Sequence, residues 1–252
     1  MQKNVLGSLL AALLLAASAF GATVPVKTAI VRVGDTQGYL ARPAGAGVHP
    51  AVIVIQEWWG LNDWIKLQAR TLAEQGYVAL APDLYHGQVA DQPQDAMKLV
   101  RAFDRDRGLK ELQAAYALLS HDAAVRPGKI GVIGWCFGGG LAASLAAEQP
   151  GLKAVVIYYG DIPSDAATVA RITPPVLGNF GGADRGIPPA RVNQFAEQMK
   201  AAGHPADIKI YPGMPHAFAG SHATSLLNNP ERNADVADAW QRTLSFFQRH
   251  LG

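Results

Sequence analysis

The chain has 252 residues, of which 49% are hydrophobic and 17% are charged. This composition supplies a large buried core and excludes an intrinsically disordered chain. The formal net charge of +2 is too small for a nucleic acid or an anionic membrane to be the main partner. The length suits one α/β domain.

The first 22 residues have the features of an export signal. The apolar run at residues 5–17 is too short to span a membrane comfortably. Small residues precede two expected cleavage points, one after Ala19 and one after Ala22. An uncleaved N-terminal anchor is the alternative. We therefore expect an exported protein, periplasmic or secreted, whose residues 23–252 form a single domain.

In chain order, apolar runs and turn residues predict strands that alternate with helices. A hairpin is expected first, with strands at 27–33 and 37–41. Further strands are expected at 51–56, 77–81, 129–133, 153–159, 176–180 and 207–211. Helices are expected at 62–75, 94–103, 108–119, 138–147, 189–202 and 233–250. This order predicts an α/β fold with a doubly wound, mainly parallel sheet and helices on both faces. Ligands bind at the carboxyl ends of such strands.

The strongest candidate for chemistry is the run Gly134-Trp135-Cys136-Phe137-Gly138, which lies between a predicted strand and a predicted helix. Its spacing matches the nucleophile elbow of the α/β-hydrolase fold, with Cys in place of Ser. The turn puts the thiol at a helix N-terminus, where the dipole favours a thiolate. Cys136 is the single cysteine of the chain, so an intrachain disulfide is excluded. A buried apolar residue and an intermolecular link are the alternatives.

Two further residues follow later strands in the order nucleophile, acid, base that this fold uses. Asp184 comes after the strand at 176–180, and Asp161 is the alternative acid one strand earlier. His216 comes after the last strand, and His222 in the same loop is the alternative base. The acid holds the imidazole in one tautomer and stabilises its charged form. The pattern predicts a triad with the elbow cysteine.

Other strand ends supply the remaining candidate residues. Glu57 ends the first long apolar strand, and its carboxylate is expected to face the same pocket. The backbone N–H groups of Trp58 and Phe137 occupy the positions of the two oxyanion-hole donors. The candidate substrate-binding residues are Trp59, Tyr85, His86 and Arg185. No group of residues has metal-ligand spacing, so we expect no metal. The glycines that follow Cys136 are part of the elbow rather than of a dinucleotide-binding motif, so we expect no organic cofactor.

These segments together resemble the dienelactone hydrolase (carboxymethylenebutenolidase) family over essentially the whole chain after the signal. They are Gln56-Glu57-Trp58-Trp59-Gly60, Ala81-Pro82-Asp83-Leu84-Tyr85, Gly134-Trp135-Cys136-Phe137-Gly138-Gly139, Gly182-Ala183-Asp184 and His216-Ala217-Phe218. The resemblance implies a Cys-Asp-His triad at Cys136, Asp184 and His216. It also implies that Glu57 meets the cysteine in the resting enzyme and helps to form the thiolate when substrate binds. The free enzyme then keeps a largely neutral thiol.

The chain departs from the family's pattern at two positions. Members that cleave dienelactone have an arginine shortly after the PDLY run and another shortly after the histidine, and both bind the substrate carboxylate. Gly87 and Gly220 occupy those places here, which removes a charge-assisted bidentate hydrogen bond. Arg185 is either a replacement cation or a surface charge. We therefore expect a substrate other than dienelactone itself.

The sequence thus predicts a hydrolase that cleaves a carboxylic ester or lactone through a thioester on Cys136. A thiolate leaves a tetrahedral adduct more readily than an unprotonated amine does, which makes a peptidase the weaker alternative. A second alternative is a non-catalytic, redox-sensing thiol protein on the same scaffold. We expect a small-molecule substrate, a monomer, and no nucleic-acid or membrane partner after signal removal.

Overall fold

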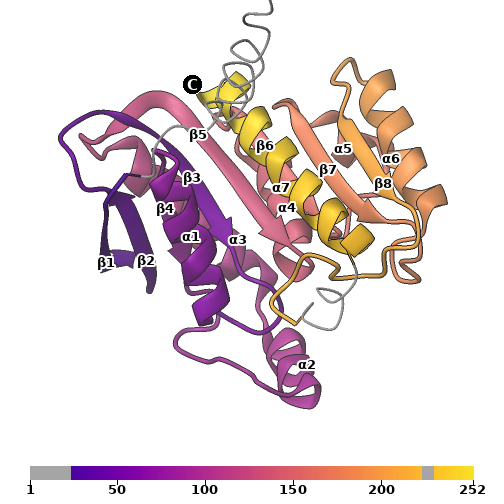
Figure 1. Cartoon of the computed structure of the whole chain (residues 1–252), viewed down its shortest axis with the longest axis horizontal. Helices are drawn as coiled ribbons and strands as arrows, with labels where there is room; N and C mark the ends of the chain where they lie inside the picture. Colours follow the sequence, from indigo (N-terminus) through magenta and orange to yellow (C-terminus); the bar gives the residue numbers. More distant parts are fainter. Residues whose placement is uncertain (1–23, 223–229) are drawn as a thin grey trace, which may run out of the picture.

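The computed structural model describes residues 24–222 and 230–252. The expected export signal and both of its cleavage points lie outside these residues. An eight-stranded sheet forms the middle layer, and helices cover its two faces (Figure 1). The predicted α/β fold with a mainly parallel sheet is confirmed. No helix within the two described ranges is long and apolar enough to cross a membrane.

The strand order of the sheet is β1-β2-β4-β3-β5-β6-β7-β8. The strands β1 (Val26–Val33) and β2 (Thr36–Pro43) form the predicted hairpin around Gly34, and β2 pairs with β4 in antiparallel orientation. All pairs from β4 to β8 are parallel. The remaining strands are β3 (His49–Ile55), β4 (Val78–Pro82), β5 (Val125–Trp135), β6 (Ala154–Tyr158), β7 (Val176–Gly181) and β8 (Asp207–Tyr211). The winding direction changes between β3 and β5, which places the ligand crevice beside their carboxyl ends.

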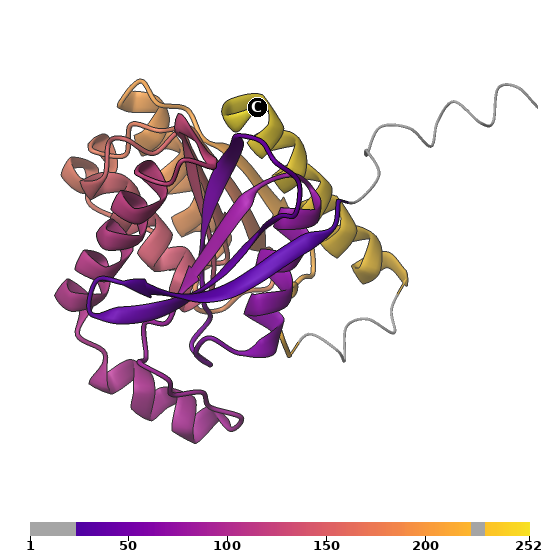
Figure 2. The ribbon, with the colours of Figure 1, turned by 90° about the vertical axis from the view of Figure 1, so that its left-hand side faces the viewer.

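The helices divide between the two faces of the sheet and one edge. One face is covered by α1 (Asp63–Glu74) and α7 (Pro230–Leu251). The helices on the other face are α3 (Arg105–Ser120), α4 (Phe137–Glu148), α5 (Ala166–Ala170) and α6 (Pro189–Ala201). The helix α2 (Pro93–Ala102) instead projects from the edge where the parallel strands end (Figures 1 and 2).

The apolar run of β3 shows why the sheet is buried on both faces. Its residues from Ala51 to Ile55 are all fully buried. Ile53 and Ile55 join the core cluster under α3 and α4, whereas Val52 and Val54 join the cluster under α1 and α7. Continuous Val and Ile runs are typical of parallel strands with helices on either side. This packing fixes the positions of the loops that follow the strands.

Two elements differ most from the sequence prediction, and α3 and α7 each begin three residues before their expected starts. The strand β5 begins at Val125, four residues before the expected start. Its first residues pair with β3 ahead of an irregularity in register around Pro127 and Gly128. These two residues are typical of a turn, so the sequence did not indicate a strand there. The short helix α5 was not predicted. It begins where the Asp165 side chain accepts a hydrogen bond from the Thr168 N–H at 2.8 Å, and its five residues are too few for a periodic pattern.

Candidate active site

Cys136 lies on the sharp turn between β5 and α4, as the elbow pattern predicts. Its backbone angles are φ 53° and ψ −115°, a conformation that is costly for a residue with a side chain. The flanking glycines allow the turn to form. A Cβ at Gly134 would collide with the backbone of Gly138, and a Cβ at Gly138 would collide with the Ile55 carbonyl. The strained residue of this turn is therefore the candidate nucleophile.

The three residues of the predicted triad meet in one hydrogen-bonded chain. The Cys136 Sγ lies 3.1 Å from His216 Nε2, and His216 Nδ1 lies 2.7 Å from Asp184 Oδ2. The other oxygen of Asp184 accepts backbone N–H groups from Gly186 at 2.8 Å and Ile187 at 3.0 Å. Asp184 is 3% exposed, so these bonds hold its carboxylate in place. With a proton on Nδ1 donated to Asp184, Nε2 can accept the thiol proton.

The two alternative triad residues have other partners. Asp161 forms an ion pair with Arg191 at 2.6 Å, and its side chain is exposed. The ring of His222 packs on Trp59 with 4.0 Å between centroids, and its Nδ1 lies 2.9 Å from Ser221 Oγ. The hydrogen-bonded chain therefore contains Asp184 and His216, the residues that the sequence favoured.

The electrostatic surroundings keep the thiol neutral. Burial is the main cause that raises the pKa of the Cys136 thiol to about 12, and the charge of the nearby Glu57 carboxylate is the second cause. A hydrogen bond from the Phe137 N–H lowers this pKa, and the more distant Asp184 raises it. At neutral pH the free protein thus holds Cys136 as a thiol, the protonation state that the family resemblance implies.

Glu57 lies at the end of β3 as expected and is 2% exposed. Its Oε2 accepts hydrogen bonds from the Ser221 backbone N–H at 3.0 Å and from the Ser221 hydroxyl at 2.7 Å. Burial raises the pKa of Glu57, while the two Ser221 bonds and the charges of His222 and His216 lower it. The resemblance implies a resting contact between Glu57 and Cys136. Here Glu57 binds Ser221 instead, and the thiol binds His216.

Glycine at position 220 leaves the space that Glu57 occupies. A Cβ at Gly220 would collide with Glu57 Oε1 and would lie 3.3 Å from the Tyr159 hydroxyl. Tyr159 is fully buried, has a φ of 37°, and packs edge-on against His216 with 5.3 Å between centroids. The sequence did not single out Tyr159 or Ser221. Any side chain at 220, such as the arginine that the resemblance implies for other members, would require Glu57 to move.

Glycine at position 87 is favoured for a different reason. Its φ is +89°, a region that L side chains rarely adopt, and its N–H donates to Asp83 Oδ2 at 2.6 Å. A Cβ there would meet nothing within 4 Å. Backbone conformation rather than lack of space therefore favours glycine at this position.

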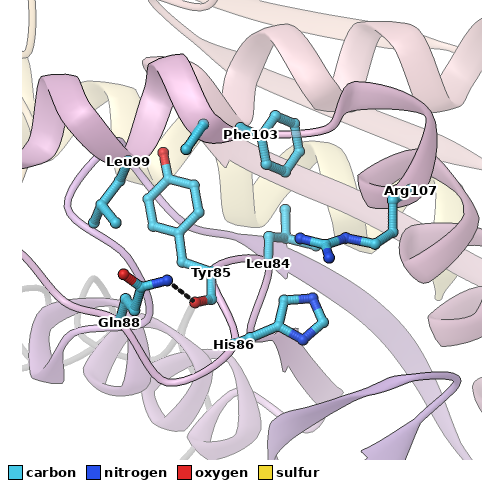
Figure 3. A pocket seen from close by; sticks show the side chains of 8 residues that line it. Leu84, Tyr85, His86, Gln88, Leu99, Phe103 and Arg107 are labelled. Atoms are coloured by element: carbon cyan, nitrogen blue, oxygen red, sulfur yellow. Dashed lines mark hydrogen bonds between the residues drawn. The ribbon is translucent and has the colours of Figure 1, made fainter.

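The candidate substrate-binding residues occupy different places. Trp59 is buried and packs edge-on against Trp58 with 4.9 Å between centroids. Tyr85 and His86 belong to the loop after β4 and line a pocket of about 360 Å³ (Figure 3). Arg185 is exposed beside the triad acid. The other residues that line the pocket are Leu84, Gln88, Leu99, Ala102, Phe103 and Arg107, none of which the sequence indicated.

Within residues 24–222 and 230–252, no three His, Cys, Asp or Glu side chains lie close enough together to hold a metal ion.

The doubly wound sheet and the strained elbow define the class of α/β hydrolases. The profile of the Dienelactone hydrolase family matches residues 36–251. The chain belongs to this family of hydrolases, and its substrate is a small molecule.

Similar proteins cover most of the chain. A provisionally named carboxymethylenebutenolidase from Methylorubrum extorquens is 32% identical over 231 residues, which are 86% of this chain and 78% of that protein. A relative of the same name from Yersinia pestis is 33% identical over 242 residues, covering 89% and 88% of the two chains. The crystal structure of a provisionally named dienelactone hydrolase from Klebsiella pneumoniae superimposes with a TM-score of 0.79 at 29% identity, covering 89% of this chain and 99% of that chain.

Proposed function

We propose that this protein hydrolyses a carboxylic ester or lactone with Cys136 as the nucleophile. One observation supports the proposal above all others. The thiol, the imidazole and the buried carboxylate form a continuous chain, with 3.1 Å between Cys136 and His216 and 2.7 Å between His216 and Asp184. A nucleophile, a base and a residue that orients the base are the parts that covalent acyl transfer requires.

The reaction proceeds in two acyl-transfer steps. His216 Nε2 accepts the thiol proton as the sulfur attacks the substrate carbonyl, and the backbone N–H groups of Trp58 and Phe137 stabilise the oxyanion. The C–O bond breaks, the alkoxide takes the proton from His216, and an acyl thioester remains on Cys136. Water then gives a proton to His216 and attacks the thioester. The acid product leaves, and the thiol regains its proton.

Glu57 has a role before the chemistry begins. Burial is the largest effect that disfavours the thiolate in the free protein, and the negative charge of Glu57 is the second largest. The thiolate is also the form that oxidants attack. A neutral resting thiol would therefore protect the single cysteine in an exported enzyme, and we propose that residues 1–22 direct that export.

The substrate class follows from the two glycines. Gly87 and Gly220 stand where the family places arginines, and Glu57 fills the space beside Gly220. The protein therefore has no cation at those two positions to pair with a carboxylate next to the lactone ring. We propose an ester or lactone other than dienelactone as its substrate.

The direct test is hydrolysis of p-nitrophenyl acetate by the chain after residue 22. Wild-type protein is compared with Cys136→Ala and Cys136→Ser, and circular dichroism checks that each variant is folded. Turnover that is lost in Cys136→Ala, together with a trapped acyl-enzyme mass on Cys136, supports the proposal. Equal rates in wild type and Cys136→Ala would overturn it. Reversible oxidation of Cys136 without turnover of any ester would instead favour the redox-sensing alternative.

A further inference from the structure

The carboxylate of Glu57 is a buried group close to the nucleophile. Glu57 is 2% exposed, and its charge is the second cause, after burial, that raises the pKa of the Cys136 thiol. A carboxylate oxygen accepts hydrogen bonds, and a thiol is a weak donor. Glu57 is therefore a competitor of His216 for the proton of the thiol. The contact that the thiol makes is with His216 Nε2, at 3.1 Å.

Two contacts turn the Glu57 carboxylate towards the loop that follows the triad histidine. Its Oε2 accepts hydrogen bonds from the Ser221 backbone N–H at 3.0 Å and from the Ser221 hydroxyl at 2.7 Å. Its Oε1 lies against Gly220, in the space that a Cβ there would need. Both oxygens are thus directed at residues 220 and 221. Because hydrogen bonds to an ionised group are roughly twice as strong as neutral ones, Ser221 holds the carboxylate firmly.

The ring of His222 fixes the direction in which the Ser221 hydroxyl donates. The hydroxyl has one proton and an ionised Glu57 has none to offer, so this proton points to Oε2. The hydroxyl oxygen then accepts a hydrogen bond from His222 Nδ1, which lies 2.9 Å away. His222 itself packs on Trp59, with 4.0 Å between ring centroids. A second hydrogen-bonded chain, from His222 through Ser221 to Glu57, therefore runs beside the triad.

The charged and titratable groups around Glu57 come from separate segments of the chain. Burial raises the pKa of Glu57, and the two Ser221 bonds are the largest effects that oppose it, followed by the charges of His222 and His216. Burial, and after it the charge of Glu57, raise the pKa of Tyr159 well above its usual value, so this tyrosine keeps its proton. Among the groups that face Glu57, Ser221 thus contributes most to keeping it ionised.

We propose that Ser221 is a positioning residue that holds Glu57 away from Cys136, so that the Cys136–His216 pair is assembled before substrate arrives. Without the Ser221 hydroxyl, the Glu57 side chain turns towards the thiol and accepts its hydrogen bond in place of His216. This inference rests on the proposed hydrolase function and names what prepares that site for reaction. The state of the thiol can nevertheless be measured without any substrate.

Alkylation by iodoacetamide reports on the free thiol, since Cys136 is the single cysteine. Ser221→Ala should slow alkylation at neutral pH by roughly tenfold or more, the effect of losing one hydrogen bond to a charged group. Ser221→Thr keeps the hydroxyl and should react like wild type. Ser120→Ala is the matched control, because the Ser120 hydroxyl bonds the Ala117 carbonyl within α3. Circular dichroism checks that each variant is folded.

A double-mutant cycle separates positioning from a merely structural role. In a Glu57→Gln background the competing charge is absent, so adding Ser221→Ala should leave the alkylation rate and its pH profile unchanged. A structural role for Ser221 would slow alkylation by the same factor in both backgrounds, and that result would overturn the proposal. Alkylation of Ser221→Ala at the wild-type rate, or equal slowing in Ser221→Thr, would do the same.

Hydrolysis of p-nitrophenyl acetate extends the test to turnover. Ser221→Ala should lower kcat/KM by about the same factor as the alkylation rate, because both constants refer to the free protein. If Cys136-dependent hydrolysis is found but Ser221→Ala is alkylated and turns over like wild type, the positioning proposal is wrong and the hydrolase proposal stands. If alkylation depends on Ser221 through Glu57 but no ester is hydrolysed, the positioning of the thiol is supported and the hydrolase proposal is wrong.

Discussion

The carboxylate of Glu57 occupies the space that any side chain at Gly220 would need, since a Cβ there would collide with Glu57 Oε1. The contact joins the end of β3 to the loop that contains His216. Its position is fixed by Ser221, whose N–H and hydroxyl both donate to the other oxygen of Glu57.

We expect Gly220→Ala to displace Glu57 and to disturb its two bonds with Ser221. Overpacking of a buried site lowers the free energy of unfolding by about 1–3 kcal/mol, which urea denaturation measures. Gly45→Ala is the matched control, because a Cβ at Gly45 meets nothing within 4 Å. An unchanged stability of Gly220→Ala would show that Glu57 moves aside without cost.

We expect Glu57→Gln to lower the pKa of the Cys136 thiol from about 12, because the negative charge of Glu57 is the second-largest cause of its elevation, after burial. The pH dependence of alkylation by iodoacetamide reports this pKa directly, since Cys136 is the single cysteine. Alkylation that begins at lower pH in the variant is the expected result. An unchanged profile would mean that burial alone keeps the thiol neutral.

The same substitution should change the pH dependence of stability. Burial raises the pKa of folded Glu57 above its value of 4.5, so the folded state prefers the protonated carboxyl. Its stabilising contribution is present below the unfolded pKa and is lost as the pH rises through the folded pKa. Glu57→Gln should therefore be more stable than wild type at pH well above the folded pKa, with the difference vanishing in acid. Denaturant titrations across this range check the sign, and a difference that grows in acid would contradict it.

We expect Asp184→Asn to lower kcat on p-nitrophenyl acetate by a factor on the order of 10⁴, the effect known for the corresponding change in a serine triad. Asparagine donates to the imidazole and favours the wrong tautomer. Asp161→Asn is the control, because Asp161 pairs with Arg191 and should leave the rate unchanged. A normal rate in Asp184→Asn would remove that residue from the proposed triad.

The export proposal has a simple readout. We expect bacterial expression of the full chain to yield periplasmic or secreted protein whose mass matches cleavage after Ala19 or Ala22. Mass spectrometry of the fractionated protein decides this. A full-length chain that stays with the membrane fraction would favour the uncleaved anchor.

Much of the site could be predicted because its residues directly follow strands. The elbow glycines mark Cys136, and the strand order brings Asp184 and His216 to the same edge. The contact of Ser221 with Glu57 joins residues 164 positions apart, and no local pattern in the sequence encodes it. The same holds for the pocket at Arg107, which depends on how the segment between α2 and α3 folds over the loop after β4.

Some elements of the fold could likewise be predicted from the sequence, and others could not. Buried Val and Ile runs such as β3 are recognisable because their pattern is local. The first residues of β5 were missed because Pro127 and Gly128 indicate a turn, and pairing with β3 overrides that preference. A helix of five residues such as α5 has no period to detect, and only its cap at Asp165 marks it.

The helix α2 is attached to the rest of the protein by little buried surface. Ala96 is its one buried residue among those described, and that residue packs with Trp59 and Ala90. Leu99 and Ala102 of the same helix line the pocket. Mutations in α2 can therefore reshape this pocket while the sheet and the elbow remain intact. The ten residues of α2, Pro93–Ala102, can thus change their packing with little effect on the rest of the core.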